Sequence, residues 1–364
     1  MTKQIVLFGS TGSIGIQTLN IAKEHNIKVK ALSAHSNIEL LQQQQREFNV
    51  EHISLSSVNP DLLCGLASFP DCTIVNAIVG SAGLKPTIAA LEAGNPVALA
   101  NKETLVAGGE LVMELSRKHN APIVPIDSEH SAIMQCLSCY SDIQFNNNNI
   151  SKIILTASGG AFHGYTKEQL KQVTKKQALR HPNWSMGDKI TIDSSTMMNK
   201  GLELIEAMYL FNINESKIEI VIHPQSIVHS AVEFIDGTII AQMSVPDMRL
   251  PIQYALTYPQ RLPSPAKRLS LTEISKLTFS EPNYDTFRCL ALARTAARLG
   301  GNAPCILNAA NEVAVSLFLE DKIAFYEISE IVEEALNKVE KTRDITLEII
   351  EQTEKQVKEN INCQ

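Results

Sequence analysis

The sequence lacks a long apolar run and an excess of positive charge. No stretch approaches the roughly 20 apolar residues that a membrane-spanning helix needs, and 32 Lys and Arg stand against 39 Asp and Glu, for a formal net charge of -7. Proteins that bind a nucleic-acid backbone usually present a basic surface. We therefore expect neither a membrane protein nor a nucleic-acid-binding protein, and the expected location is cytoplasmic.

Cysteine is also sparse. The 364 residues include seven cysteines, an odd number scattered along the chain, which indicates reduced thiols rather than a disulfide framework. Only Cys136 and Cys139 are close, and their C-x-x-C spacing suits a redox pair or half of a zinc site. No second pair or histidine cluster follows them, so we interpret both as apolar thiols in a helix.

The first third of the chain alternates apolar runs typical of buried parallel strands with stretches typical of helices. Strands are expected at residues 4–8, 28–33, 73–79, 96–100 and 121–126, with helices at 14–25, 84–93 and in the segment that ends at His119. This βαβ pattern predicts an α/β fold with a Rossmann-like, doubly wound parallel sheet.

The middle of the chain changes character after the polar tract 144–150, which we interpret as a loop. A strand is expected at 152–156, and the runs 231–235 and 238–241 around Asp236-Gly237 predict an antiparallel hairpin. The end of the chain is helical in pattern. The predicted domains are a Rossmann-like domain (1–126), an α+β catalytic domain (127–258), a linker (259–282) and a helical domain (283–364).

A glycine-rich turn, Gly9-Ser-Thr-Gly-Ser-Ile-Gly15, joins the first expected strand to the first expected helix. Backbone N–H groups at a helix N-terminus can hold a pyrophosphate, and glycine allows it to approach closely. Such a turn can also exist for packing alone, but its βαβ context favours a dinucleotide. The second strand ends in Ser33-Ala-His-Ser-Asn37 without the acid typical of NAD sites, which favours NADP.

Two polar stretches follow later strands. Asn101-Lys102-Glu103 comes after strand 96–100, where Lys102 could reach a ligand or could begin a solvated helix. Ser158, in Thr156-Ala-Ser-Gly-Gly-Ala161, could belong to a phosphate-binding nest or to an ordinary turn.

Carboxylates are placed in two stretches. Asp127 and Glu129 flank Ser128 directly after strand 121–126, where acids serve as helix caps or as ligands of a hard cation. In the second stretch, 193–206, Ser194 to Thr196 are expected to cap a helix on which Asn199, Lys200 and Glu203 share one side.

This second stretch suits a phosphate monoester, because hydroxyls, an amide and an ammonium gather at a helix N-terminus. Glu203 could join Asp127 and Glu129 around Mg²⁺ or Mn²⁺. Alternatively, Glu203 is an exposed charge paired with Lys200, and Glu206 has a similar role one turn later. The single Trp, Trp184, lies among Pro, Asn and Gly and indicates a loop that closes over a site.

Together these stretches resemble the 1-deoxy-D-xylulose 5-phosphate reductoisomerase family. Its motifs occur in family order across nearly the whole chain: GSTGSIG, LANKE, DSEH, SGG, RHPNWSMG, DSSTMMNKGLE, HPQSIVHS and NAANE. The resemblance implies an NADPH- and metal-dependent oxidoreductase of the methylerythritol phosphate pathway of isoprenoid biosynthesis. It would isomerise 1-deoxy-D-xylulose 5-phosphate by a retro-aldol and aldol sequence and reduce the product to 2-C-methyl-D-erythritol 4-phosphate.

The resemblance also implies a homodimer, a metal that is Mg²⁺ or Mn²⁺ with Co²⁺ as a third candidate, and a set of site residues. The implied metal ligands are Asp127, Glu129 and Glu203, and the implied catalytic residues are Lys102, Glu129 and His181. Implied substrate contacts are Ser128, Glu129, Ser158, His181, Trp184, Met186, Ser194, Asn199, Lys200 and Glu203. Implied NADPH contacts are Thr11, Gly12, Ser13, Ile14, His35, Ser36, Asn37, Asn101, Lys102, Glu103 and Gly187.

Some points stay open at the level of the sequence. His35-Ser36 stands where the family often has a basic residue, so we expect a weaker preference for NADPH over NADH than a lysine would give. His229 is either a supporting residue of the site or a satisfied core histidine. The alternatives are another two-domain NADP oxidoreductase, such as a semialdehyde or homoserine dehydrogenase, and an NADP-sensing regulatory module, because fold alone does not prove catalysis.

Overall fold

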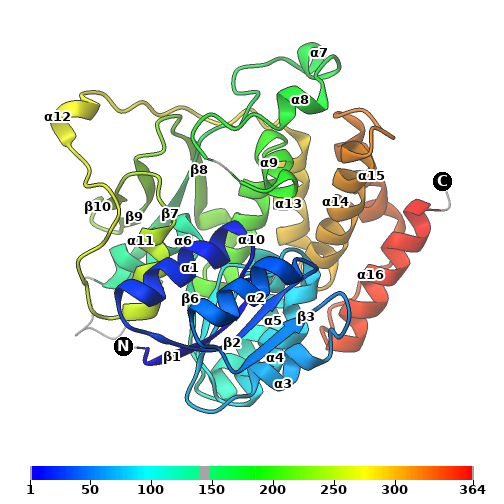
Figure 1. Ribbon diagram of the computed structural model, residues 1–364. Coiled ribbons are helices and arrows are strands. Elements are labelled where there is room, and N and C mark those ends of the chain that lie inside the picture. Colours follow the sequence, from blue (N-terminus) through cyan, green and yellow to red (C-terminus); the bar gives the residue numbers. More distant parts are fainter. Residues whose placement is uncertain (1, 139–146, 185, 363–364) are drawn as a thin grey trace. The chain divides into compact units, whose positions relative to one another are not determined.

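The computed structural model describes residues 2–138, 147–184 and 186–362, and the chain forms two compact units (Figure 1). Unit 1 consists of Met1–Thr104, Glu110–Ser131 and Asp247–Lys267. Unit 2 consists of Leu105–Gly109, Ala132–Pro246 and Arg268–Gln364. Each unit has an apolar core of its own.

Unit 1 is built on a six-stranded parallel sheet with the strand order β3-β2-β1-β4-β5-β6. The central strands are continuous apolar runs because both faces of a parallel sheet are covered. The order reverses between β1 and β4, the point at which open α/β sheets bind ligands at the carboxyl ends of their strands. The strands are β1 (Gln4–Phe8), β2 (Lys28–Ala34), β3 (His52–Leu55), β4 (Thr73–Asn76), β5 (Val97–Leu99) and β6 (Ile123–Pro125).

Helices connect these strands. They are α1 (Ser13–Glu24), α2 (Ile38–Glu47), α3 (Leu62–Ala67), the short η1 (Ser81–Gly83), α4 (Leu84–Glu92), α5 (Lys102–Lys118) and α6 (Ser128–Leu137). A later helix, α11 (Arg249–Thr257), returns to unit 1 and packs on α1. The predicted Rossmann-like sheet is confirmed. β3 and α2 were not expected from the sequence, because a strand of four residues is short and α2 contains few apolar residues among its glutamines.

Unit 2 contains a four-stranded sheet with the order β10-β9-β7-β8. Its strands are β7 (Ile150–Ala157), β8 (Ile218–Ile222), β9 (Val228–Phe234) and β10 (Ile239–Met243). β7 pairs with β8 in parallel and with β9 antiparallel, and β10 pairs antiparallel with β9. The predicted hairpin is confirmed: Gly237 has a φ of 82°, and Phe234 N donates to Thr238 O across the turn.

The helices of unit 2 fall into two groups. The short η3 (Asn147–Asn149) precedes β7, and between β7 and β8 come α7 (Lys167–Leu170), α8 (Lys175–Ala178), α9 (Asp188–Ser195), α10 (Met198–Phe211) and the short η4 (Glu215–Lys217). After the short α12 (Leu271–Ile274) come α13 (Arg288–Leu299), α14 (Ala303–Leu319), α15 (Glu327–Lys338) and α16 (Leu347–Asn362). Figure 1 shows these last four helices, coloured gold to red, packed side by side. One core joins the sheet, α10 and α13 to α15.

The compact units differ from the predicted domain boundaries. Residues 247–258, assigned from the sequence to the catalytic domain, group with unit 1, and the helical C-terminal region shares the core of unit 2. The proline-rich passage near Tyr258–Pro265 leads to the change from unit 1 to unit 2 at Lys267. A separate catalytic domain and helical domain remain a prediction.

Two further expectations concern reduced cysteines and the lack of a membrane-spanning helix. Cys64, Cys72, Cys289 and Cys305 are free, and Cys136 is buried in α6. Cys139 lies outside the described residues, as do residues 144–146 of the polar tract. The rest of the tract, expected to be a loop, forms η3 and the first residue of β7. No helix in the described part of the chain is both long and apolar enough to span a membrane.

Candidate active site

The turn after β1 is shaped by close backbone packing. Gly9 has a φ of +79°, and a Cβ at this position would meet Ala77 O at 2.4 Å; a Cβ at Gly15 would meet Gly9 O at 2.2 Å. Gly12, the N-cap of α1, provides no side chain to the helix N-terminus, and Gly12 and Ser13 are exposed. Thr11 to Ile14 therefore surround a helix N-terminus that is open to an anion.

The end of β2 carries hydroxyl and imidazole groups without a lysine. His35, Ser36 and Asn37 are exposed, and Asn37 caps α2 by accepting a hydrogen bond from Leu40 N at 3.1 Å. His35 Nδ1 lies 3.3 Å from Ser56 Oγ, and Ser57 Oγ donates to His35 O at 2.6 Å. The sequence analysis missed Ser56 and Ser57, because they follow β3, a strand that it did not predict.

Asn101, Lys102 and Glu103 are buried at the start of α5, so the alternative of a solvated helix start is wrong. Asn101 caps α5 by accepting from Thr104 N at 2.9 Å and donates to Ile78 O and Gly80 O at 2.7 and 2.8 Å. This amide therefore joins the loop after β4 to α5. The Lys102 ammonium donates to Asp127 Oδ2 at 2.7 Å.

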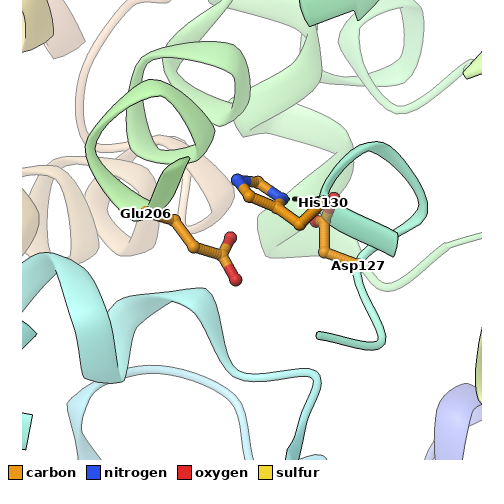
Figure 2. A group of neighbouring side chains, drawn as sticks. All are labelled: Asp127, His130 and Glu206. Atoms are coloured by element: carbon orange, nitrogen blue, oxygen red, sulfur yellow. Dashed lines mark hydrogen bonds and ion pairs between the residues drawn. The ribbon is translucent and has the colours of Figure 1, made fainter. Parts of the chain in front are cut away.

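Asp127 follows β6 and is the centre of a polar cluster in unit 1. Besides Lys102, its carboxylate accepts from Glu129 N at 3.1 Å and from His130 Nδ1 at 3.0 Å, the bond drawn in Figure 2. Burial alone would raise the pKa of Asp127, but the Lys102 ammonium and the His130 imidazole lower it well below its ordinary value. Asp127 is thus held as a carboxylate.

His130 has no role in the sequence analysis, yet its side chain is fully buried against Asp127. The i, i+3 spacing of the two residues at the start of a helix could have indicated the contact. Ser128 Oγ donates to Glu129 Oε2 at 2.5 Å, which orders the second carboxylate of the stretch.

In unit 2, α10 carries the third predicted carboxylate. Glu203 accepts from Asn199 Nδ2 at 2.5 Å and pairs with the Lys200 ammonium, so these three residues do share one side of the helix. Glu203 is only 1% exposed, so its interpretation as an exposed charge is wrong. Glu206, which Figure 2 also shows on α10, is buried to the same degree and is not a solvated charge either.

The residues before α10 correct another expectation. Ser194 and Ser195 form the last turn of α9 instead of capping α10, whose N-cap, Met197, has a φ of 62°. Thr196 Oγ1 accepts from Met198 N, the first residue of α10, at 3.3 Å, and Met197 N donates to Ser194 O at 3.2 Å. The sequence predicts a helix start at 194–196, slightly before the real start of α10, because left-handed backbone at methionine is rare and has no local signal.

Ser158 and His181 form a hydrogen-bonded pair. Asn183 N and Trp184 N both donate to His181 Nδ1, at 3.1 and 3.0 Å, so the Nε2 atom of the neutral ring carries the proton and donates to Ser158 Oγ at 3.0 Å. Burial lowers the pKa of His181 to about 4, which keeps the ring neutral. Gly160 N also donates to Ser158 Oγ, at 3.2 Å.

The segment around Trp184 is irregular between α8 and α9, as predicted for a loop. Asn183 Nδ2 donates to Pro224 O and to Ser226 Oγ, at 2.6 and 2.9 Å. The Trp184 ring meets the His229 ring edge to face, with 6.3 Å between centroids. Burial lowers the pKa of His229 to about 4, so this histidine too is neutral. Met186 and Gly187 precede α9, and Gly187 is its N-cap.

The sheet order and the open glycine turn after β1 are typical of one class of protein: enzymes that use a nicotinamide dinucleotide. Family models narrow the class. A model described as 1-deoxy-D-xylulose 5-phosphate reductoisomerase matches residues 5–62 and 57–109, the model of its C-terminal domain matches 123–211, and the DXP reductoisomerase C-terminal domain matches 243–360.

Individual relatives agree with the family models. Proteins named 1-deoxy-D-xylulose 5-phosphate reductoisomerase from Pelotomaculum thermopropionicum and Phocaeicola vulgatus are 51% and 48% identical, and each comparison covers 96% of this chain and 95% of the relative. A crystal structure of DOX-P reductoisomerase with NADPH, fosmidomycin and magnesium has a TM-score of 0.94 at 42% identity, covering 99% of this chain and 98% of that one.

A further solved structure, the reductoisomerase from Zymomonas mobilis in complex with NADPH, has a TM-score of 0.90 at 38% identity and covers 98% of this chain and 97% of that one. The chain belongs to the 1-deoxy-D-xylulose 5-phosphate reductoisomerase family. The resemblance, the fold class and the enzyme class expected from the sequence are confirmed, and a semialdehyde dehydrogenase, a homoserine dehydrogenase and a regulatory module are excluded.

Proposed function

We propose that this chain isomerises 1-deoxy-D-xylulose 5-phosphate and reduces it with NADPH to 2-C-methyl-D-erythritol 4-phosphate, in the methylerythritol phosphate pathway. The observation that carries the proposal is membership in the family over nearly the whole chain, with relatives solved in complex with NADPH and magnesium. The test is identification of the product by mass spectrometry after incubation with substrate, NADPH and Mg²⁺. Recovery of unchanged substrate from folded protein would contradict it.

NADPH fits the carboxyl edge of the sheet in unit 1. The turn Gly9–Gly15 brings backbone close to a ligand, and the N-terminus of α1 suits its pyrophosphate. His35, Ser36 and Asn37, with Lys102 beyond β5, complete the proposed contacts. When bound, NADPH supplies the hydride of the reduction.

A hard divalent cation fits the carboxylates Asp127, Glu129 and Glu203, which are of a kind that could hold a metal ion. Carboxylate oxygens suit Mg²⁺ or Mn²⁺, and Co²⁺ is a third candidate. When bound, the cation acts as a Lewis acid toward the substrate oxygens. The hydrogen bonds to Asp127 and the bond from Ser128 to Glu129 orient these carboxylates beforehand.

The substrate phosphate is proposed to bind in unit 2, between Ser158, Ser194, Asn199 and Lys200. Because Ser158 Oγ already accepts two hydrogen bonds, its own proton is available to a phosphate oxygen. Lys200 and Asn199 supply a charge and an amide donor from α10. These contacts hold the fragment that carries the phosphate while the carbon skeleton rearranges.

The isomerisation breaks the C3–C4 bond of the sugar in a retro-aldol step, and an aldol step then joins C4 to C2 before reduction. Both fragments must stay in place between the two steps. The loop with His181, Trp184 and Met186 is proposed to close over the substrate, exclude water and retain them. The neutral His181 ring orients the Ser158 hydroxyl through Nε2.

A homodimer and a cytoplasmic location complete the proposal. The edge strand β10 exposes Ile239 and Met243, and the adjoining Ile235 is 69% exposed. An apolar sheet edge of this kind is a natural place for a second copy to pair. The free thiols of Cys64, Cys72, Cys289 and Cys305 suit a reducing compartment. Light scattering of the purified protein tests the dimer.

A further inference from the structure

The motif Asn308-Ala-Ala-Asn-Glu312 has no part in the site described above. It lies in the middle of α14, and both asparagine side chains are fully buried. Two buried amides in one helix are unusual, because a buried polar group costs stability unless its hydrogen bonds are made. Their partners therefore indicate what the motif does.

The two asparagines have different partners. Asn308 Nδ2 donates within its own helix, to Glu312 Oε1 at 3.0 Å. Asn311 Nδ2 donates to a different element: it reaches Asp193 Oδ1 on α9, at 2.7 Å. Asp193 is 1% exposed, and its other oxygen pairs with Lys189 at 3.0 Å. Asn311 thus holds a buried carboxylate at the end of α9.

Asp193 begins a three-residue junction in which each residue is fixed to a different element. Asp193 is bonded to α14 through Asn311. Ser194 O packs on the glycine turn after β7, where a Cβ at Gly160 would meet it at 2.3 Å. Ser195 Oγ donates to Ala178 O in α8 at 2.7 Å. The position of Ser194 is therefore set from both sides, by Asp193 and by Ser195.

We propose that Asn311 is a positioning residue for the substrate phosphate: its hydrogen bond to Asp193 fixes the last turn of α9, and this places the Ser194 hydroxyl beside the Ser158 loop. This inference rests on the assignment of Ser194 to the phosphate made above. Asn311 itself touches neither substrate nor cofactor. It acts from the C-terminal helical region on a group that a phosphate would contact.

The chain offers a matched control for this proposal. Asn308 lies one turn before Asn311 on the same helix, is equally buried, and donates only within α14. In both residues the Oδ1 atom accepts no hydrogen bond from a described protein group. Leucine has the same number and branching of side-chain heavy atoms as asparagine but no polar atoms. Asn311→Leu and Asn308→Leu therefore introduce the same change of size at two equally buried positions of α14. Only Asn311→Leu removes the bond to Asp193.

The first experiment compares these variants in the full-length protein. We expect Asn311→Leu to raise the KM for 1-deoxy-D-xylulose 5-phosphate by about tenfold or more, because small misplacements of a binding group are costly. Its KM for NADPH should change less than about twofold, since the hydrogen bond lies within unit 2. Asn308→Leu should leave both constants within about twofold. An equal rise in the sugar phosphate KM for both variants, or none for Asn311→Leu, would overturn the proposal.

Binding of inorganic phosphate, measured by calorimetry, separates this inference from the proposed function. Asn311→Leu should weaken phosphate binding by the same factor as it raises the sugar phosphate KM, with Asn308→Leu like the wild type. If the wild-type protein bound phosphate but converted no sugar phosphate, the proposed function would fail while this comparison still decided the role of Asn311. Equal phosphate affinity in all three proteins would contradict the inference.

A double-mutant cycle tests the bond itself. Asn311→Asp should raise the KM at least as much as Asn311→Leu, because it sets a second carboxylate against Asp193. In the double variant Asn311→Asp with Asp193→Asn, the amide at position 193 can donate to the carboxylate at position 311, so the hydrogen bond is restored in the opposite direction. The fold increase in KM of the double variant should be well below the product of the fold increases of Asn311→Asp and Asp193→Asn measured singly. A fold increase equal to that product would show that the two residues act independently.

Discussion

Lys102 and Lys200 each pair with a carboxylate of the proposed site. The two lysines are 5% and 4% exposed, and their ammonium groups contact Asp127 and Glu203, respectively. A buried ion pair contributes little net stability, because desolvation offsets the attraction. The first pair has a consequence for the proposed site: the Lys102 ammonium lowers the pKa of Asp127, so this carboxylate stays charged.

Glu129 tests the assignment of the metal ligands. Glu129→Gln removes one ligand charge without touching the glycine turn, so NADPH affinity should stay within about twofold of the wild type. Metal-dependent turnover should fall more than about a hundredfold, because even supporting partners of metal ligands cost about 10–100-fold. NADPH binding by fluorescence and turnover by NADPH absorbance measure the two effects. Glu92→Gln, at an exposed position of α4, is the control, and normal turnover of Glu129→Gln would exclude the assigned role.

Ser36 is the subject of a second prediction, which concerns the preference for NADPH over NADH. Ser36→Lys adds a cation beside the exposed end of β2, where the 2′-phosphate of NADPH is expected. The ratio of kcat/KM for NADPH to that for NADH should rise by about fivefold, as one exposed charge pair contributes up to about 1 kcal/mol. Ser36→Met, of similar length and without charge, should not raise the ratio. A ratio that is the same in both variants would place the 2′-phosphate elsewhere.

His229 makes stability depend on pH. The unfolded chain binds a proton on this ring near the ordinary imidazole pKa of about 6.5, whereas burial lowers the pKa of the folded ring to about 4. As the pH falls through this window, protons favour the unfolded state. Between pH 6.5 and about 5 the free energy of unfolding should fall by up to about 2 kcal/mol from this group alone.

The measurement is urea unfolding of the ligand-free protein across that pH range. His229→Gln, which does not titrate there, should show a shallower pH dependence. His52→Gln, at an exposed histidine of β3, should keep the slope of the wild type. An unchanged slope for His229→Gln would mean that the buried ring does not control this loss of stability.

At the scale of elements, the turn after β7 is constrained by close backbone contact with the end of α9. Gly160 has a φ of +70°, and a Cβ there would meet Ser194 O at 2.3 Å; Gly164 has a φ of +84° with open space around it. Gly164→Ala should therefore show only the backbone strain, about 1 kcal/mol. Gly160→Ala should cost more, about 3 kcal/mol, and also raise the KM for the sugar phosphate.

Thermal unfolding and steady-state kinetics compare these two alanine variants. The difference between them isolates the contact between Gly160 and Ser194, because both replacements place alanine at a positive φ. Equal stability and equal KM in the two variants would show that this contact does not hold the end of α9.

The elements also show what the sequence could predict. β1, α1 and the hairpin of β9 and β10 were predictable because apolar period, glycine spacing and an Asp-Gly turn are local signals. The break between α9 and α10 was not, since nothing local indicates a left-handed Met197. The contacts of Ser56 with His35 and of Asn311 with Asp193 join residues 21 and 118 positions apart. Such pairs depend on tertiary packing, which one sequence does not encode in any short motif.

At the scale of the whole molecule, the proposed function draws on residues from much of the chain. The glycine turn, Lys102, Asp127 and Glu129 belong to unit 1, and Glu203, the proposed phosphate contacts and the loop with Trp184 belong to unit 2. The central claim is that turnover depends on a divalent cation and on the carboxylates proposed to bind it. The order of motifs along the chain indicated this function, although the burial of Lys102, Glu203 and Glu206 is apparent only from the structure.

The most direct measurement follows NADPH absorbance with 1-deoxy-D-xylulose 5-phosphate after chelation of all divalent metal, before and after Mg²⁺ is added back. The account predicts no oxidation by the chelated protein, full recovery with Mg²⁺, and little recovery in Glu203→Gln, which lacks one of the proposed ligand charges. Oxidation that proceeds without metal, or that Mg²⁺ restores equally in Glu203→Gln, would contradict the proposed role of the metal and of Glu203.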